Sequence, residues 1–188
     1  MKGVFGAGAG KAAAQSRQFS GLSLSQEPYD SDIWTVPGAG HAAYRQFREE
    51  MDSYTVDSSG YGRGVIETID PGLIEGIHLS TWDVEHPDQF WGQHMDGGTM
   101  DSFLEVASHI PEVKSRLDAG ADLSSLMEDP VLGTCAGVYF NPDSATAPTL
   151  VKGDGFYEFQ SNGRHRIIAA QKLGYSFPIR VIGEIVRK

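Results

Sequence analysis

The pattern of apolar and polar positions is clearest in the last part of the chain. Two short apolar runs flank Lys152-Gly153-Asp154-Gly155, a glycine-containing turn that is typical of a β-hairpin. A helical run follows and ends before Gly174, a residue type that often terminates helices. The predicted elements are two hairpin strands, a helix and a final strand, at 149–151, 156–159, 164–173 and 178–182. Tyr157 and Phe159 alternate with Glu158, which predicts that one side of the second hairpin strand is core.

The middle of the chain carries both helix and strand signals. Helices are predicted at 40–51, 99–110 and 111–120, and strands at 65–69 and 77–82. Asp122 can cap one further helical turn, because an aspartate at this position accepts a hydrogen bond from the backbone. The apolar run 131–140 is compatible with a helix or a strand, since so short a run does not reveal its period.

These elements predict an α/β fold of the α+β kind, in which a small mixed sheet is combined with helices. Residues 1–32 are rich in Gly, Ala, Ser and Gln and show little apolar periodicity, as flexible segments do. We therefore expect residues 1–64 to be a flexible leader and linker with one short helix, and residues 65–188 to be the compact domain. The longest apolar stretches are far shorter than the roughly 20 residues that a spanning helix needs, so no membrane segment is expected.

The charge of the chain is unevenly distributed. The net charge is −10, which argues against a conventional nucleic-acid-binding face built from lysine and arginine. Residues 67–129 hold fourteen acidic and two basic residues, whereas residues 156–188 hold six basic and two acidic residues. This distribution favours a local anion pocket near the end of the chain. The single cysteine, Cys135, excludes an internal disulfide.

The segment 161–166 joins the predicted strand to the predicted helix and is the strongest candidate for an anion site. Ser161 or Asn162 can cap the helix, and Gly163 lets the backbone approach a ligand closely. The amide groups at a helix N-terminus attract an anion. Arg166, in the first helical turn, can grip a phosphate through two parallel hydrogen bonds. The alternative is an ordinary strand-to-helix corner with solvated cations.

The same segment contains residues suited to catalysis. His165 can titrate near neutral pH and is the best acid or base candidate, while Arg164 can neutralise developing negative charge. A second group lies further upstream, where Asp83, His86 and Asp96 are weaker candidates for a divalent metal site or a general base. The spacing of this group matches no established ligand motif, so a solvated acidic loop that docks a partner is the alternative.

The run 162–175, followed by 177–181, resembles the signature of the ParB/sulfiredoxin (ParB-like nuclease) superfamily. The matching positions are Gly163, Arg166, Ala170, Gly174, Pro178 and Val181. This resemblance implies a ParB/sulfiredoxin-like fold in which Gly163 and Arg166 bind the phosphates of a nucleotide or nucleic acid. The motif contains no cysteine, so sulfinic-acid reduction is not expected. No DNA-reading helix-turn-helix follows it, so a role in chromosome segregation is not expected either.

The wider segment 76–184 resembles C-terminal toxin domains of bacterial polymorphic and type VII-type secreted toxins. That resemblance implies a secreted toxin acting in the cytoplasm of a target cell, with a cognate immunity protein as its partner. A nuclease is the expected activity, and the alternatives are a nucleotide-dependent transferase or NTPase and a non-catalytic nucleotide- or partner-binding module. The cofactor is open between a divalent metal and a nucleoside triphosphate.

Overall fold

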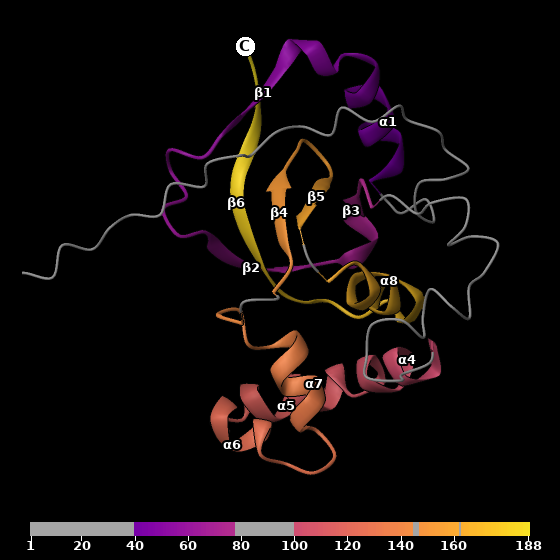
Figure 1. The fold of residues 1–188 in the computed structure, drawn as a ribbon, viewed down its shortest axis with the longest axis vertical. Helices are drawn as coiled ribbons and strands as arrows, with labels where there is room; N and C mark the ends of the chain where they lie inside the picture. Colours follow the sequence, from indigo (N-terminus) through magenta and orange to yellow (C-terminus); the bar gives the residue numbers. More distant parts are fainter. Residues whose placement is uncertain (1–39, 78–99, 145–146, 162) are drawn as a thin grey trace, which may run out of the picture.

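The computed structural model describes residues 40–77, 100–144, 147–161 and 163–188, and its centre is a six-stranded mixed sheet (Figure 1). The strands are β1 (Tyr54–Asp57), β2 (Val65–Ile69), β3 (Ile74–Glu75), β4 (Thr149–Lys152), β5 (Tyr157–Ser161) and β6 (Phe177–Arg187). The α-helices are α1 (His41–Glu49), α4 (Met100–Ser108), α5 (Ile110–Asp118), α6 (Leu123–Met127), α7 (Gly133–Tyr139) and α8 (Arg164–Leu173), with 3₁₀ turns η1 (Met51–Ser53) and η2 (Pro71–Leu73). The expected combination of a mixed sheet with helices is confirmed.

The long strand β6 organises the sheet. One edge of β6 pairs in parallel with β4, and its other edge pairs antiparallel with β2 and then with β1. β6 can accept both partners on one edge because it is 11 residues long, more than the predicted strand 178–182. On the far side of β4, β5 is antiparallel to β4 and parallel to β3. The carboxyl ends of β3 and β5 therefore meet at the same end of the sheet.

Residue 65, the expected start of the compact domain, is the first residue of β2, and part of the sheet precedes it. β1 precedes it and pairs with the end of β6 from Tyr54↔Arg187 to Asp57↔Glu184. α1 also precedes it and buries Tyr44 and Phe47 against Phe156 at the start of β5. The described fold therefore includes α1 and β1, which were expected to belong to the linker. Their partners come from the other end of the chain, so local sequence did not reveal the pairing.

The main core lies between the sheet and the helices α4, α7 and α8. α8 buries four consecutive apolar residues from Ile167 to Ala170, and it packs against α4. The undecided run 131–140 contains the helix α7, which buries Cys135, Ala136 and Tyr139 on one side. The Tyr139 ring meets Phe177 edge to face, with ring centroids 4.9 Å apart. α7 is helical because this spacing of three and four residues carries its apolar side into the core.

Most locally signalled elements are confirmed. The hairpin, the helices beginning near 100 and 110, and the helix 164–173 are present, and the Asp122 carboxylate accepts the Ser125 amide at the start of α6. The predicted strand 77–82 is not confirmed, because β3 ends at Glu75 and residues 78–99 lie outside the described ranges. Within those ranges, no helix is long and apolar enough to cross a membrane.

Candidate functional site

The turn that follows β5 has the backbone geometry expected of an anion-binding corner. Gly163 has φ +71° and ψ 23°, a left-handed conformation that favours glycine, and α8 begins at the next residue. Asn162 lies outside the described residues. Gly163 itself occupies the N-cap position, and the Ser161 hydroxyl lies 2.8 Å from Thr149 Oγ1. This bond holds the β4–β5 hairpin together at the position where the turn begins.

Arg166 folds back over the turn and also joins two helices. A Cβ atom added to Gly163 would lie 3.0 Å from Arg166 Cδ and Nε, so the side chain occupies the space beside this glycine. Arg166 Nη1 donates to the Val138 carbonyl at 3.0 Å, and Tyr139 Oη donates to the Arg166 carbonyl at 3.0 Å. Burial lowers the pKa of the guanidinium below its ordinary value. Arg166 thus has a packing role between α7 and α8, beside the phosphate contact predicted for it.

His165 and Arg164 have different surroundings although they are neighbours in sequence. The His165 side chain is only 7% exposed and stacks on Phe103 of α4, with ring centroids 5.1 Å apart. Arg164 is half-buried at the first position of α8. The structure therefore places the predicted acid or base in the interface between α4 and α8, whereas Arg164 begins α8 directly after Gly163.

The predicted metal ligands are not part of the described geometry. Asp83, His86 and Asp96 lie outside the described residues. Among the residues that the structure describes, no group of three or more His, Cys, Asp or Glu side chains is arranged to hold a metal ion.

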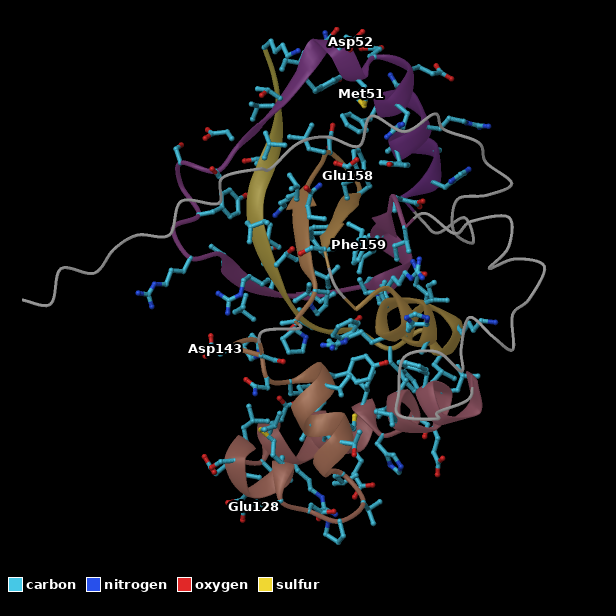
Figure 2. All side chains as sticks on the ribbon, in the orientation of Figure 1. Met51, Asp52, Glu128, Asp143, Glu158 and Phe159 are labelled. Carbon is cyan, nitrogen blue, oxygen red and sulfur yellow. The ribbon has the colours of Figure 1, made fainter. Side chains whose placement is uncertain are left out.

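A cluster of buried polar residues, unnoticed in the sequence, lies between α1 and the β3–β5 strand pair. Glu75 and Glu158 are register partners in this parallel pair, and their exposed fractions are 2% and 0%. Tyr157 and Phe159 pack against the main core from one side of β5, as predicted, and the Glu158 side is buried as well because α1 covers it. Figure 2 shows Glu158 on β5, one residue before Phe159.

Side chains from α1 and β5 contact both carboxylates. His41 Nδ1 lies 3.6 Å from Glu75 Oε2, while Tyr44 Oη donates to Glu158 Oε1 at 3.4 Å. His41 and Tyr44 are three residues apart and so lie on one side of α1. Gln160 Nε2 donates to Glu158 Oε2 at 3.2 Å. Burial raises the pKa of Tyr44, and the charge of Glu158 raises it further, so this hydroxyl stays protonated and acts as a donor.

Gly76, which follows β3, makes this packing possible. Its φ of +76° is left-handed, and an added Cβ would lie 2.9 Å from Tyr44 Oη and 3.1 Å from Glu158 Cγ. Any side chain would therefore push the tyrosine away from the carboxylate. One sequence signal did exist, because a glutamate within an apolar strand is unusual. This signal does not show which residues the glutamate meets.

Comparisons with known proteins add no assignment. No family model matches this chain, no curated protein matches it, and no solved structure matches it. The structure therefore defines this protein only as a mixed α+β fold with a six-stranded mixed sheet. Its activity has to be argued from the residues themselves.

Proposed function

We propose that this chain is a phosphate-directed hydrolase with a ParB/sulfiredoxin-like fold, with nucleic acid as the leading substrate. The observation that carries the proposal is the left-handed Gly163 directly between β5 and α8, followed at once by Arg164. The turn thus combines a left-handed glycine, the amides of a helix N-terminus and a cation. The motif resemblance at 162–181 includes Gly163 of this turn and Arg166 beside it.

The roles of the turn residues follow from their positions. A phosphate at the start of α8 would accept hydrogen bonds from the first backbone amides, and Arg164 would offset the negative charge that develops in the transition state. Arg166 would keep the turn in shape through its contacts with Gly163 and Val138, and it would reach the phosphate from the same side. A nucleotide-dependent transferase or NTPase would use the same grip, so it is the first alternative.

The biological setting remains part of the proposal. The resemblance of 76–184 to toxin domains supports a secreted effector that acts in the cytoplasm of a target cell and is neutralised by an immunity protein. Arg164 and Arg166 place two cations at the start of α8, so an acidic immunity surface would complement the turn. The group Asp83, His86 and Asp96 stays a prediction for a metal site.

The test is inducible expression of the whole chain in bacteria, with growth, DNA integrity and RNA integrity followed together. Arg164→Ala should relieve growth arrest and nucleic-acid degradation. Lys172→Ala, which removes an exposed cation in the last turn of the same helix, is the matched control and should stay toxic. Arg166→Ala should also relieve arrest, but its packing role requires a check that the variant folds.

Three outcomes distinguish the candidates. The nuclease is supported if growth arrest is accompanied by degraded nucleic acid, and if Arg164→Ala relieves both while Lys172→Ala does not. Arrest with intact nucleic acid shifts the proposal to nucleotide consumption. Absence of arrest, together with absence of cleavage by the purified chain, favours the non-catalytic binding module and overturns the hydrolase.

A further inference from the structure

A surface pocket lies between α1, β1, the β4–β5 turn and the end of β6, and its volume is about 170 Å³. It shares no residue with the Gly163 turn or with the buried polar cluster. An apolar cavity of roughly 150 Å³ can hold benzene, so this pocket has room for one six-membered ring. The residues that line it are Ala43, Gln46, Phe47, Tyr54, Asp154, Phe156 and Ile185.

The base of this pocket is aromatic. Phe47 and Phe156 are 5% and 3% exposed, and their ring centroids are 5.3 Å apart. The Tyr54 ring meets Phe47 edge to face at 5.4 Å between centroids. Ala43 and Ile185 pack against the same cluster. A bound molecule would therefore find apolar and aromatic surface on its inner side.

The mouth of the pocket is polar. Gln46 on α1 and Asp154 in the β4–β5 turn are both exposed. Among the residues that the structure describes, no hydrogen bond or ion pair engages the Asp154 carboxylate or the Gln46 side-chain amide. Asp154 is also the charged member of the lining residues, so the pocket combines an apolar base with a negative charge at its opening.

One wall of the pocket already contacts a cation. The guanidinium carbon of Arg187 lies over the Tyr54 ring, 5.3 Å from its centroid. Cations are attracted to aromatic rings at such distances. Arg187 Nη2 also lies 2.7 Å from Glu50 Oε2, so its positive charge is offset by an ion pair outside the lining residues. Arg187 therefore leaves the negative charge of Asp154 as the charge that a ligand meets.

We propose that this pocket binds a small primary amine, with its ammonium group at Asp154 and its apolar body against Phe47 and Phe156. The ammonium complements the carboxylate, and the Gln46 amide oxygen can accept a further N–H bond. An anionic ligand of the same size would meet the Asp154 charge unfavourably, and a neutral one would leave it unpaired. The inference is independent of the proposed hydrolase, because it involves neither the phosphate turn nor cleavage.

Binding at this position would hold α1 to the sheet. The lining residues come from α1, β1, the β4–β5 turn, the start of β5 and β6, so one ligand contacts all of these segments. A molecule that binds only the folded state stabilises it in proportion to the logarithm of its concentration. The melting temperature of the whole chain should therefore rise as the amine is added.

The experiment titrates the purified whole chain with benzylamine at neutral pH, followed by amide chemical shifts in NMR and by thermal unfolding. We expect saturable shifts at Ala43, Phe47, Asp154 and Ile185, with a Kd of about 1 mM for so small a ligand. Benzyl alcohol has nearly the same shape without the charge, and it should bind about two- to fivefold more weakly, as loss of an exposed ion pair predicts. Phenylacetate should bind more weakly still.

Two pairs of variants test the position of the ligand. Ala43→Leu places a larger side chain in the pocket and should abolish the saturable shifts, whereas Ala42→Leu, at the exposed neighbouring position of α1, should keep them. Asp154→Asn should weaken benzylamine binding about two- to fivefold and leave benzyl alcohol unaffected. Glu49→Gln removes one negative charge from an exposed site outside the lining residues and is the control for net charge.

The outcomes are distinct. Absence of saturable shifts in the folded wild type at about ten times the expected Kd overturns the site. Equal affinities for benzylamine and benzyl alcohol, or full benzylamine affinity in Asp154→Asn, overturn the assignment of an ammonium ligand. Saturable shifts that persist in Ala43→Leu place the ligand elsewhere and overturn the site as well. If Ala43→Leu does not fold, Asp154→Asn decides the question, because its exposed side chain makes no contact that the fold requires.

Discussion

Glu75 and Glu158 sit side by side on neighbouring parallel strands, and both carboxyl groups are buried beneath α1. Burial of a charged group is costly unless hydrogen bonds or opposite charges compensate it. The contacts from His41, Tyr44 and Gln160 supply such compensation. The packing of α1 on the β3–β5 pair therefore depends on these contacts.

Tyr44→Phe should lower the free energy of unfolding by about 1–3 kcal/mol. The substitution keeps the ring packing against Phe156 but removes a donor from the buried Glu158 carboxylate. Chemical denaturation measures the change. Tyr61→Phe is the control, because the half-buried Tyr61 hydroxyl makes no hydrogen bond within the described residues, and it should change stability little. Equal losses of unfolding free energy in the two variants would show that the hydrogen bond to Glu158 contributes no net stabilisation.

Gly163→Ala and Gly174→Ala form a matched pair at the two ends of α8. Both glycines are left-handed, with φ of +71° and +69°, so each alanine should cost about 1–2 kcal/mol of stability. Only at Gly163 would the new methyl group press on the Arg166 side chain, since nothing lies within 4 Å at Gly174. We expect cleavage activity to fall in Gly163→Ala alone. A similar fall in both variants would assign the effect to the helix and not to the turn.

Phe47→Ala should destabilise the protein by about 3 kcal/mol or more, because Phe47 is 5% exposed and packs with Phe156 and Tyr54. Thermal or chemical unfolding of the whole chain measures this. Glu49→Ala, at an exposed position on the same helix, should stay within about 0.5 kcal/mol of the wild type. Unchanged stability in Phe47→Ala would mean that α1 is not part of the folded unit.

Cys135 should be unreactive in the folded protein. Burial raises its thiol pKa to about 12, so at pH 8 the thiol stays protonated and shielded. A chromogenic disulfide reagent should therefore label it slowly at pH 8 and rapidly after unfolding in guanidinium. Rapid labelling of the folded protein would contradict this burial.

The same pKa shift has a defined effect on stability. The folded thiol pKa exceeds the unfolded value, so its contribution is complete below about pH 9 and is lost as the pH rises toward 12. Between these values the wild type should lose more stability than Cys135→Ala. Tyr157, whose pKa burial and the bond to Glu67 raise to about 12, titrates in both proteins and so cancels in the comparison. Parallel pH curves for the two proteins would refute the assignment.

Local signals were sufficient for several elements. The β4–β5 hairpin was predicted from its glycine-containing turn, and α8 from its helical run and the following Gly174. The Asp122 cap of α6 was predicted from one side chain near the start of a short helix. Each of these elements depends on residues within a few positions of one another, so the local sequence is enough to predict it.

Other features depended on residues that are distant in the chain. β1 needs the end of β6 as its partner, so residues 54–57 gave no sign of belonging to the sheet. Within the segment 131–140, the helix α7 forms because Cys135 and Tyr139 can then pack together into the core. Burial of His165 against Phe103 likewise required α4 and α8 to pack together.

The sequence by itself determined the turn that opens α8, because backbone conformation at a glycine and the start of a helix depend on neighbouring residues. It also placed Arg164 and Arg166 in the first turn of that helix. Only the tertiary structure decided which titratable groups meet: it buried His165, and it brought His41, Glu75 and Glu158 together from three separate elements. The physical reason is that burial and charge pairing depend on contacts across the sheet, which no local pattern specifies.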